Sequence, residues 1–225
     1  MKSGPRLVRA RPSMALFFIK AAHCFYLRTK QFEEQNTVPT EDFNAQIIGG
    51  IISAVSFLEC YINEVYADAA EEDVRCSKIP SEKLKLISKM WNRGIPRTAR
   101  YSILEKYNIF LDLVDAEPFD KGRFPYQDAS ILIDIRNEMV HFEPYWTTIE
   151  NSEAVMPSKP NKFESKLKGR FASSKLHKMD YFFFPHYCFS SDCVRWAFDS
   201  AKELSFDFSR RANVESTLND LKWEI

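Results

Sequence analysis

The sequence predicts an all-helical bundle, and three observations support this fold class. Glycine is scarce, at six of 225 residues, whereas folds rich in strands place many glycines in their turns. Apolar residues recur at steps of three and four positions along a segment without proline, residues 40–79. Residues that favour helix N-termini precede several such segments, and prolines follow them. Together these patterns predict helices packed around an apolar core.

The first two helices are predicted between residues 13 and 72. Ser13 is a good N-cap for a helix that runs to about residue 34. The second helix starts near Thr40, where acidic residues favour the positive end of the helix dipole. Its buried face is marked by one apolar stripe: Ile47, Ile51, Ala54, Val55, Leu58, Ile62 and Val65. Two glycines inside it, Gly49 and Gly50, each cost about 1 kcal/mol relative to alanine. We expect another backbone to pack closely against them.

The middle of the chain predicts three shorter helices. Ser81 opens the third helix, which Gly94 and Pro96 end. A fourth helical segment spans residues 98–114, and a loop with two prolines and a glycine follows it. The fifth helix runs from about residue 127 to about residue 142, where Pro144 stops it.

The chain divides into three parts by composition. Residues 1–12 form a basic N-terminal tail, and residues 13–144 form the helical bundle. Residues 145–225 form a linker and a C-terminal helical extension that we expect to pack on the bundle. The extension contains an aromatic run at residues 181–184 and a predicted helix at 191–211.

Charge and cysteine content restrict the classes of function. Thirty-one basic residues balance thirty-one acidic ones, so a nucleic acid would have to bind to local patches. Residues 47–58 carry no charge but are too few to span a bilayer. Five scattered cysteines, without a CxxC pair, indicate reduced thiols rather than a disulfide framework or a zinc site. These observations predict a cytoplasmic protein that does not bind membranes and holds neither metal nor cofactor.

The end of the fifth helix carries the residues best suited to chemistry. Asn137 and His141 are four positions apart and therefore neighbours on one face. Arg136 lies about 140° from His141 around an ideal helix and could join it through its long side chain. A second copy of the helix across a two-fold axis would bring both sets of residues into one cleft.

These three residue types suit cleavage of RNA. A guanidinium such as that of Arg136 can bind phosphate oxygens and stabilise the charge of the transition state. An imidazole such as that of His141 can transfer a proton, and the amide of Asn137 can orient either group. Because RNA carries its own nucleophile, the 2′-hydroxyl, this chemistry requires no metal.

The arrangement Arg136-Asn137-x-x-x-His141 resembles the R-x4-6-H motif of HEPN (higher eukaryotes and prokaryotes nucleotide-binding) domains. The apolar residues 131–135 before it and residues 140–144 after it agree with this resemblance. The predicted second helix, with residues 54–64, is similar to the long second helix of several HEPN groups. The resemblance covers about residues 13–144.

The resemblance implies a dimeric helical bundle whose Arg and His residues line a shared cleft. Many such domains are metal-independent endoribonucleases of toxin–antitoxin, phage-defence or stress systems, which implies RNA as substrate and an antitoxin or regulatory protein as partner. Products would carry 2′,3′-cyclic phosphate and 5′-hydroxyl ends. One toxin subgroup carries tyrosine two residues after the histidine, where this chain has Glu143.

Other residues are candidates for supporting roles. Glu59 and Asn63 lie four positions apart on the second helix and could face the same cleft, with Arg136 or Asn137 as partners. The segment 159–178 holds seven basic residues against one acidic residue and could hold RNA. Its candidate RNA-binding residues are Lys162, Lys166, Lys168 and Arg170.

Several alternatives remain open. Arg136 and His141 could form an ion pair and a C-terminal cap at a helix end, because cations favour that end, with Asp134 or Glu138 as ion-pair partners. The basic segment could be a solvated face. At the level of the whole protein, the alternatives are an inactive HEPN-like dimerising scaffold that binds nucleic acid, nucleotide or protein, and an unrelated helical interaction protein.

Overall fold

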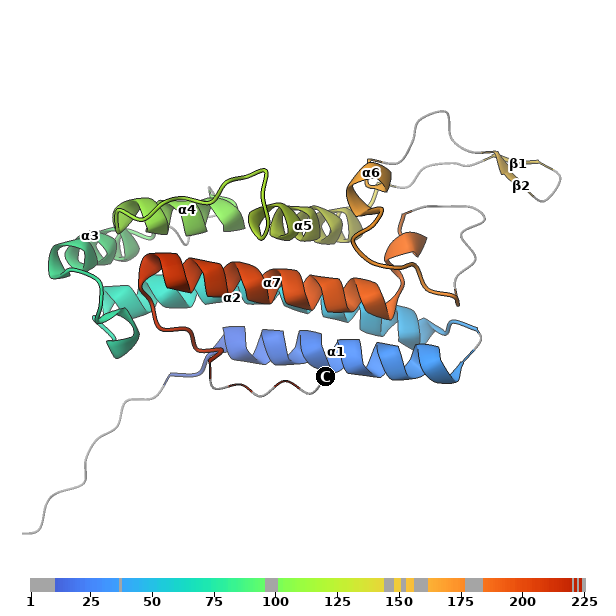
Figure 1. Cartoon of the computed structure of the whole chain (residues 1–225), viewed down its shortest axis with the longest axis horizontal. Coiled ribbons are helices and arrows are strands. Elements are labelled where there is room, and N and C mark those ends of the chain that lie inside the picture. Colours follow the sequence, from blue (N-terminus) through green and yellow to red (C-terminus); the bar gives the residue numbers. More distant parts are fainter. Residues whose placement is uncertain are drawn as a thin grey trace, which may run out of the picture.

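A computed structural model describes residues 11–36, 38–95, 101–143, 148–150, 153–155, 162–176, 184–219, 221 and 223. The predicted all-helical class is confirmed for these residues (Figure 1). The helices are α1 (Met14–Gln35), α2 (Glu41–Ala70), α3 (Ser81–Asn92), α4 (Ile103–Leu113), α5 (Tyr126–Val140), α6 (Glu164–Leu167) and α7 (Ser191–Ala212), with short 3-10 turns at Val74–Cys76 and His186–Cys188. A small antiparallel hairpin joins β1 (Thr148–Glu150) to β2 (Glu153–Val155), with Thr148 opposite Val155.

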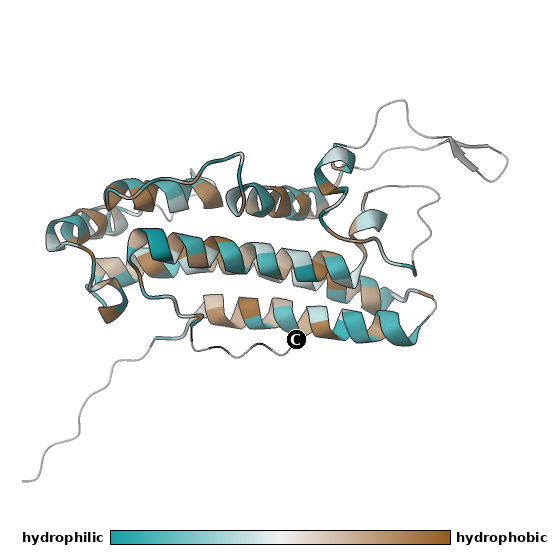
Figure 2. Cartoon of the chain, viewed as in Figure 1, coloured by the Kyte–Doolittle hydropathy of each residue, from teal (hydrophilic) through white to brown (hydrophobic). Residues whose placement is uncertain are grey.

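The three longest helices run side by side along the length of the molecule. Helices α1 and α7 both pack against α2 and against each other. Helices α4 and α5 follow one another along the side of the bundle opposite α1, and α3 lies at one end (Figure 1). Brown, apolar turns alternate with teal, polar turns along these helices, as expected for helices that bury one face (Figure 2).

Side-chain caps begin the first two helices at the predicted residues. The Ser13 hydroxyl accepts a hydrogen bond from the Leu16 N–H at 3.1 Å, and the Thr40 hydroxyl accepts one from the Phe43 N–H at 3.2 Å. Each cap satisfies a backbone donor that the first helical turn leaves without a partner. The predicted starts of α1 and α2 are therefore confirmed, with their physical cause.

The two glycines of α2 allow close packing, but the neighbours are side chains and not the expected backbone. A Cβ on Gly49 would lie 3.0 Å from the ring of Phe25 in α1. A Cβ on Gly50 would lie 2.5 Å from Cγ1 of Val194 in α7. The glycines therefore let α1 and α7 approach α2 along one side.

Helix α7 is an integral part of the bundle. The predicted helix at 191–211 is confirmed, and its buried residues belong to the same apolar core as those of α1, α2, α4 and α5. The C-terminal extension therefore completes the core that residues 13–144 begin, because α7 covers the side of α2 between α1 and α4.

Some helix boundaries differ from the predicted ones, and some predicted segments lie outside the described residues. Helix α4 begins at Ile103, five residues later than the predicted start at residue 98. Helix α5 ends at Val140, two residues before its predicted end. The basic tail up to residue 10 and the aromatic residues 181–183 lie outside the described residues, whereas Phe184 is buried in the core.

Helix α2 is long and apolar for a structural reason. Among the described residues, it is the helix long and apolar enough to cross a membrane by length and composition. Within the bundle it packs against α1, α3, α4, α5 and α7, and more than half of its most apolar stretch is buried. Its composition is that of a central core helix surrounded by other helices.

Candidate functional site

Asn137 and His141 lie together at the C-terminal end of α5. His141 is the C-cap residue, and its backbone N–H donates to the Asn137 carbonyl at 2.8 Å. Both side chains are exposed, and both line a cavity of about 290 Å³. The cavity is completed by Asp134, Glu138, Lys162, Phe163 and Lys166. One side of the cavity is thus a stripe of α5, and the other is the segment that contains α6.

Arg136 does not line this cavity. On an ideal helix the two positions would be about 140° apart, and the structure ends α5 at Val140, with His141 as the C-cap. The residue is half-buried, and its Nε is a buried donor that has no hydrogen-bond partner in the part of the chain that the structure describes. Within one chain, the structure therefore brings together Asn137 and His141 but leaves the Arg136 guanidinium on another side of the helix.

Glu59 and Asn63 have a different partner from the one expected. The Lys106 Nζ on α4 donates to Glu59 Oε1 at 2.9 Å and to Asn63 Oδ1 at 3.5 Å. The Lys106 side chain is only 3% exposed, whereas that of Glu59 is 45% exposed. A buried ammonium requires such partners. Glu59 therefore neutralises Lys106, Asn63 accepts a second, longer hydrogen bond from it, and neither α2 residue lines the cavity of His141.

The four candidate RNA-binding residues all pair with carboxylates of this chain. Lys166 Nζ lies 3.0 Å from Asp134 Oδ2, and Lys162 donates to Glu138. Lys168 pairs with Glu164 at 2.6 Å, four positions earlier in the same segment. The side chains of these three lysines remain 63%, 46% and 64% exposed for Lys162, Lys166 and Lys168, as on a solvated face whose charges pair with carboxylates.

Arg170 differs from the three lysines because its contacts are partly buried. It donates to Asp128 near the start of α5 and to Gln127 Oε1 at 3.2 Å. The second oxygen of Asp128 accepts from Trp196 Nε1 of α7 at 3.1 Å. The Arg170 and Asp128 side chains are only 22% and 15% exposed. Arg170 therefore joins its segment to α5, and through Asp128 to Trp196 of α7, which is a structural role; its RNA-binding role stays a prediction.

We did not identify from the sequence the two ion pairs that Asp134 and Glu138 of α5 form with Lys166 and Lys162. Asp134 and Glu138 were considered as partners for Arg136 or His141, and the structure pairs them with Lys166 and Lys162 instead. Their spacing of four positions was a usable signal, because it predicts a negative stripe on one helix face. The sequence did not show that residues 162–170 cover that stripe.

The described residues contain no group of three or more His, Cys, Asp or Glu side chains that could hold a metal ion. The chemistry available in the cavity is therefore that of an imidazole, an amide and two ammonium groups beside two carboxylates. This set can transfer protons and bind an anion.

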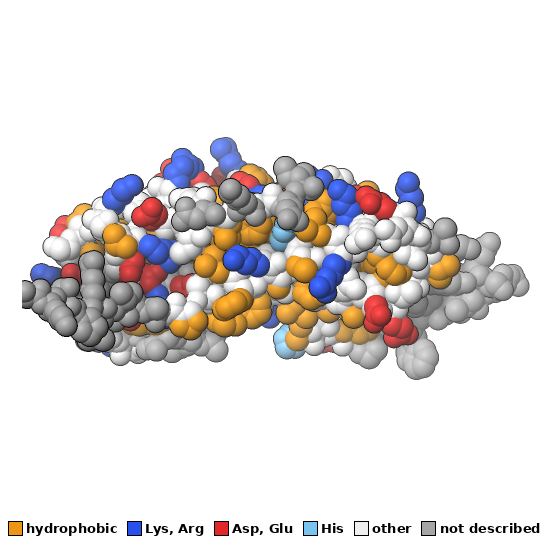
Figure 3. All heavy atoms as spheres, turned by 90° about the horizontal axis from the view of Figure 1, so that it is seen from below, with side chains coloured by type: hydrophobic (Ala, Val, Ile, Leu, Met, Phe, Trp, Pro, Cys, Tyr) orange, Lys and Arg blue, Asp and Glu red, His pale blue; other side chains and the backbone are white. Residues whose placement is uncertain are grey.

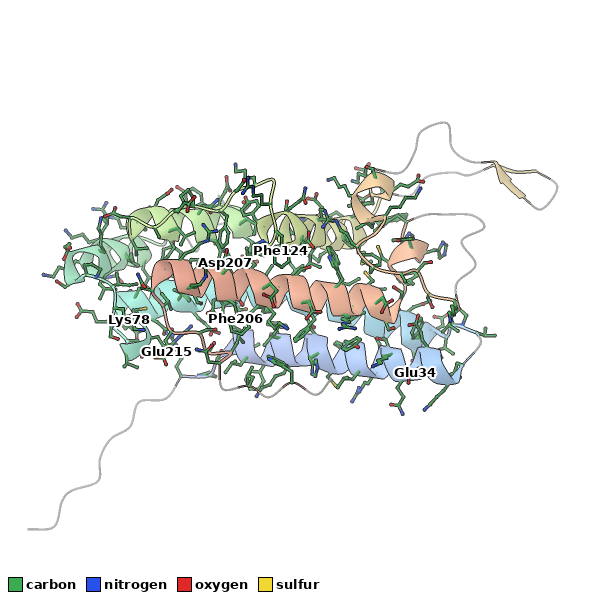
Figure 4. The ribbon with its side chains drawn as sticks, viewed as in Figure 1. Glu34, Lys78, Phe124, Phe206, Asp207 and Glu215 are labelled. Carbon is green, nitrogen blue, oxygen red and sulfur yellow. The ribbon has the colours of Figure 1, made fainter. Side chains whose placement is uncertain are left out.

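Two larger cavities lie elsewhere in the described part of the chain. One of about 820 Å³ is lined by α7 and the residues around it, among them Lys78, Phe124, Phe206, Asp207 and Glu215 (Figure 4). Another of about 510 Å³ lies between the end of α1 and the start of α7, beside Glu34. Each is lined by three cations and three carboxylates, and neither contains a histidine. By volume, these two cavities are the stronger candidates for a functional site. The smaller cavity is the better candidate by its chemistry, because it contains the imidazole of His141.

The chain matches no protein-family model, and no curated protein or solved structure matches it at a significant level.

Proposed function

We propose that this chain is a metal-independent endoribonuclease of the HEPN type. The observation that carries the proposal is the cavity at the end of α5, where Asn137 and His141 are exposed side by side with two lysines. The residue order Arg136-Asn137-x-x-x-His141, at the end of a core helix of a helical bundle, supports the same class of activity. The enzyme acts on RNA in the cytoplasm.

The chemistry follows from RNA's own nucleophile. The 2′-oxygen attacks the adjacent phosphorus while the bond to the 5′-oxygen breaks. One base removes the 2′-hydroxyl proton, and one acid supplies a proton to the leaving 5′-oxygen. His141 performs one of these two transfers, Asn137 orients the reacting groups, and cations stabilise the negative charge on the phosphorane-like transition state.

Arg136 enters this site through a second copy of the chain. Its buried Nε has no hydrogen-bond partner among the described residues, and buried donors normally find one. Helix α2, which packs against α5, has no charged residue between Asp42 and Glu59. Its partly exposed positions in that stretch include Ala45, Ile48, Ile52 and Ser56. An uncharged stretch of α2 with partly exposed positions suits the interface of a homodimer.

We also propose that a protein partner, an antitoxin or a regulatory protein, controls the activity. The chain has a net charge of zero, so it does not attract RNA at long range. An antitoxin or regulatory protein that covers the end of α5 would block the cavity of His141. The competing function is an inactive scaffold with the same fold, which binds its partners without using the imidazole.

The test is incubation of the purified protein with total RNA and with tRNA in EDTA, beside the variant His141→Ala. We expect the wild type to cleave and the variant to lose about 10²- to 10⁴-fold in rate, the range for loss of a general acid or base. The fold should persist, because the His141 side chain is exposed. Circular dichroism would check this.

Glu143→Gln is the matched control, since Glu143 is exposed two residues away and does not line the cavity. It should cleave at the wild-type rate. Products with 5′-phosphate ends would exclude attack by the 2′-oxygen. Absence of cleavage by every protein would favour the scaffold function.

A further inference from the structure

Two lysines and two carboxylates alternate around the cavity that Asn137 and His141 line. Asp134 and Glu138 lie four positions apart on α5, and each holds one lysine of the segment around α6. Asn137 and His141 lie on the same stripe of α5, three positions after Asp134 and Glu138, respectively. Both ammonium groups therefore lie in the cavity that Asn137 and His141 line.

The backbone that carries the lysines is held in place independently of these ion pairs. Phe163 and Leu167 are buried in the core, and Phe163 packs against the ring of Phe184 with centroids 5.0 Å apart. Arg170 anchors the same segment to Asp128. The positions of Lys162 and Lys166 at the cavity therefore do not depend on their carboxylate partners.

In each lysine–carboxylate pair, another anion can replace the carboxylate. The side chains of Lys162 and Lys166 are 63% and 46% exposed. Ion pairs at such exposed positions are worth no more than about 1 kcal/mol, because water and salt screen them. A phosphate that enters the cavity can replace a carboxylate at either lysine with little loss, since an ammonium group binds phosphate as readily.

We propose that Lys162 and Lys166 form a phosphate-binding subsite for single-stranded RNA beside His141, and that Asp134 and Glu138 occupy these lysines as internal anions in the free protein. The inference rests on the proposed function and deepens it, because it names the residues that hold the phosphate within one chain. Arg136 of a second copy and the two lysines would then bind different oxygens of the RNA backbone.

The same segment offers a matched control pair. Lys168 and Glu164 are joined at 2.6 Å, and the Lys168 side chain is 64% exposed, as much as that of Lys162. Neither Lys168 nor Glu164 lines the cavity. Substitution of this pair changes the charge of the segment by the same amount but leaves the subsite intact.

The experiment measures binding of a short 2′-O-methyl single strand, which lacks the free 2′-hydroxyl and therefore cannot be cleaved. Fluorescence anisotropy in EDTA over a series of salt concentrations gives the affinity and its salt dependence. We expect Lys162→Ala and Lys166→Ala each to lower the slope of log affinity against log salt by about 0.7, the value for one phosphate contact of a single strand. Lys168→Ala should leave the slope unchanged.

The carboxylates give a result of opposite sign. Asp134→Asn and Glu138→Gln should tighten binding by up to about fivefold, the equivalent of one exposed ion pair. Glu164→Gln should tighten it much less. Two results would overturn the inference. One is a decrease of the salt slope in Lys168→Ala equal to that in the cavity variants. The other is weaker RNA binding by Asp134→Asn and Glu138→Gln with the fold intact.

Cleavage of unmodified RNA, measured in parallel, separates this inference from the proposed function. Selective loss of binding in the two cavity variants without cleavage by the wild type would support the subsite and contradict the nuclease. Cleavage that depends on His141 but not on Lys162 or Lys166 would support the nuclease and contradict the subsite.

Discussion

Gly50 lies where α2 meets α7, and its missing side chain sets the distance between the two helices. A Cβ at this position would lie 2.5 Å from Cγ1 of Val194, whose β-branched side chain has little rotamer freedom. We expect Gly50→Ala to lower the free energy of unfolding by about 1–3 kcal/mol, because overpacking outweighs the gain in helix propensity. Urea denaturation followed by circular dichroism would measure it.

Gly49 is the control for that prediction. A Cβ there would meet the ring of Phe25 at 3.0 Å, and a ring at this distance needs to shift by only a few tenths of an ångström. Gly49→Ala should therefore change stability by less than about 1 kcal/mol. Val194→Ala should partly rescue Gly50→Ala. Wild-type stability of Gly50→Ala alone would show that α7 can move away from α2.

Exposed apolar side chains are found on α1 as well as near the candidate site. Phe17 is 64% exposed, and orange side chains are visible on the face that carries α1 (Figure 3). Single exposed apolar residues are common on proteins and indicate no function by themselves. Val140, next to His141, is 52% exposed and lies four positions after Arg136, so the proposed homodimer would cover it.

Helix α4 begins with a complete capping box, which explains its start. The Ser102 hydroxyl accepts from the Glu105 N–H at 3.3 Å, and the Ser102 N–H donates to Glu105 Oε2 at 2.7 Å. We expect Ser102→Ala to lower the free energy of unfolding by about 1 kcal/mol. Thermal or urea denaturation at neutral pH would measure the change.

The partner residue of the box adds a dependence on pH. The hydrogen bonds from the Ser102 N–H and hydroxyl lower the pKa of Glu105. A lowered carboxyl pKa means that the contribution is present above the unfolded pKa and is lost as the pH falls through the folded pKa. Glu105→Ala should therefore differ from the wild type at neutral pH and converge with it in acid. A difference that persists in acid would contradict this origin.

The whole molecule has one apolar core, and that core contains ionisable thiols and phenols. Burial raises the pKa of Cys76 to about 12 and raises those of Tyr107 and Cys193 well above their ordinary values. In the unfolded chain, thiols and phenols ionise at about pH 8.5 and 10. Groups with raised folded pKa values stabilise the protein below their unfolded pKa, and this contribution is lost as the pH rises.

We therefore expect the free energy of unfolding to fall as the pH rises from about 8.5 to 12. Urea denaturation at a series of pH values would measure the decline. In Cys76→Ala the decline should be less steep, although the variant is less stable at neutral pH. Cys24→Ala, which removes an exposed thiol, should decline as the wild type does. A free energy that stays constant up to pH 11 would refute this role of the core.

Local sequence patterns determined most of the elements of the fold. The caps at Ser13 and Thr40 and the apolar stripe of α2 predicted helices close to those observed. These features depend on residues within a few positions of each other, so the sequence contains all the information they need. The spacing of Asn137 and His141 likewise determined that they share one face of α5.

Only the tertiary structure decided which distant segments meet. It placed Lys106 against Glu59, α7 against Gly50, and the segment around α6 over Asp134 and Glu138. Helical periodicity indicates which face of a helix is polar or apolar, but not which remote part of the chain covers that face. Those pairings depend on the packing of all the helices at once, and the candidate site takes its lysines from that packing.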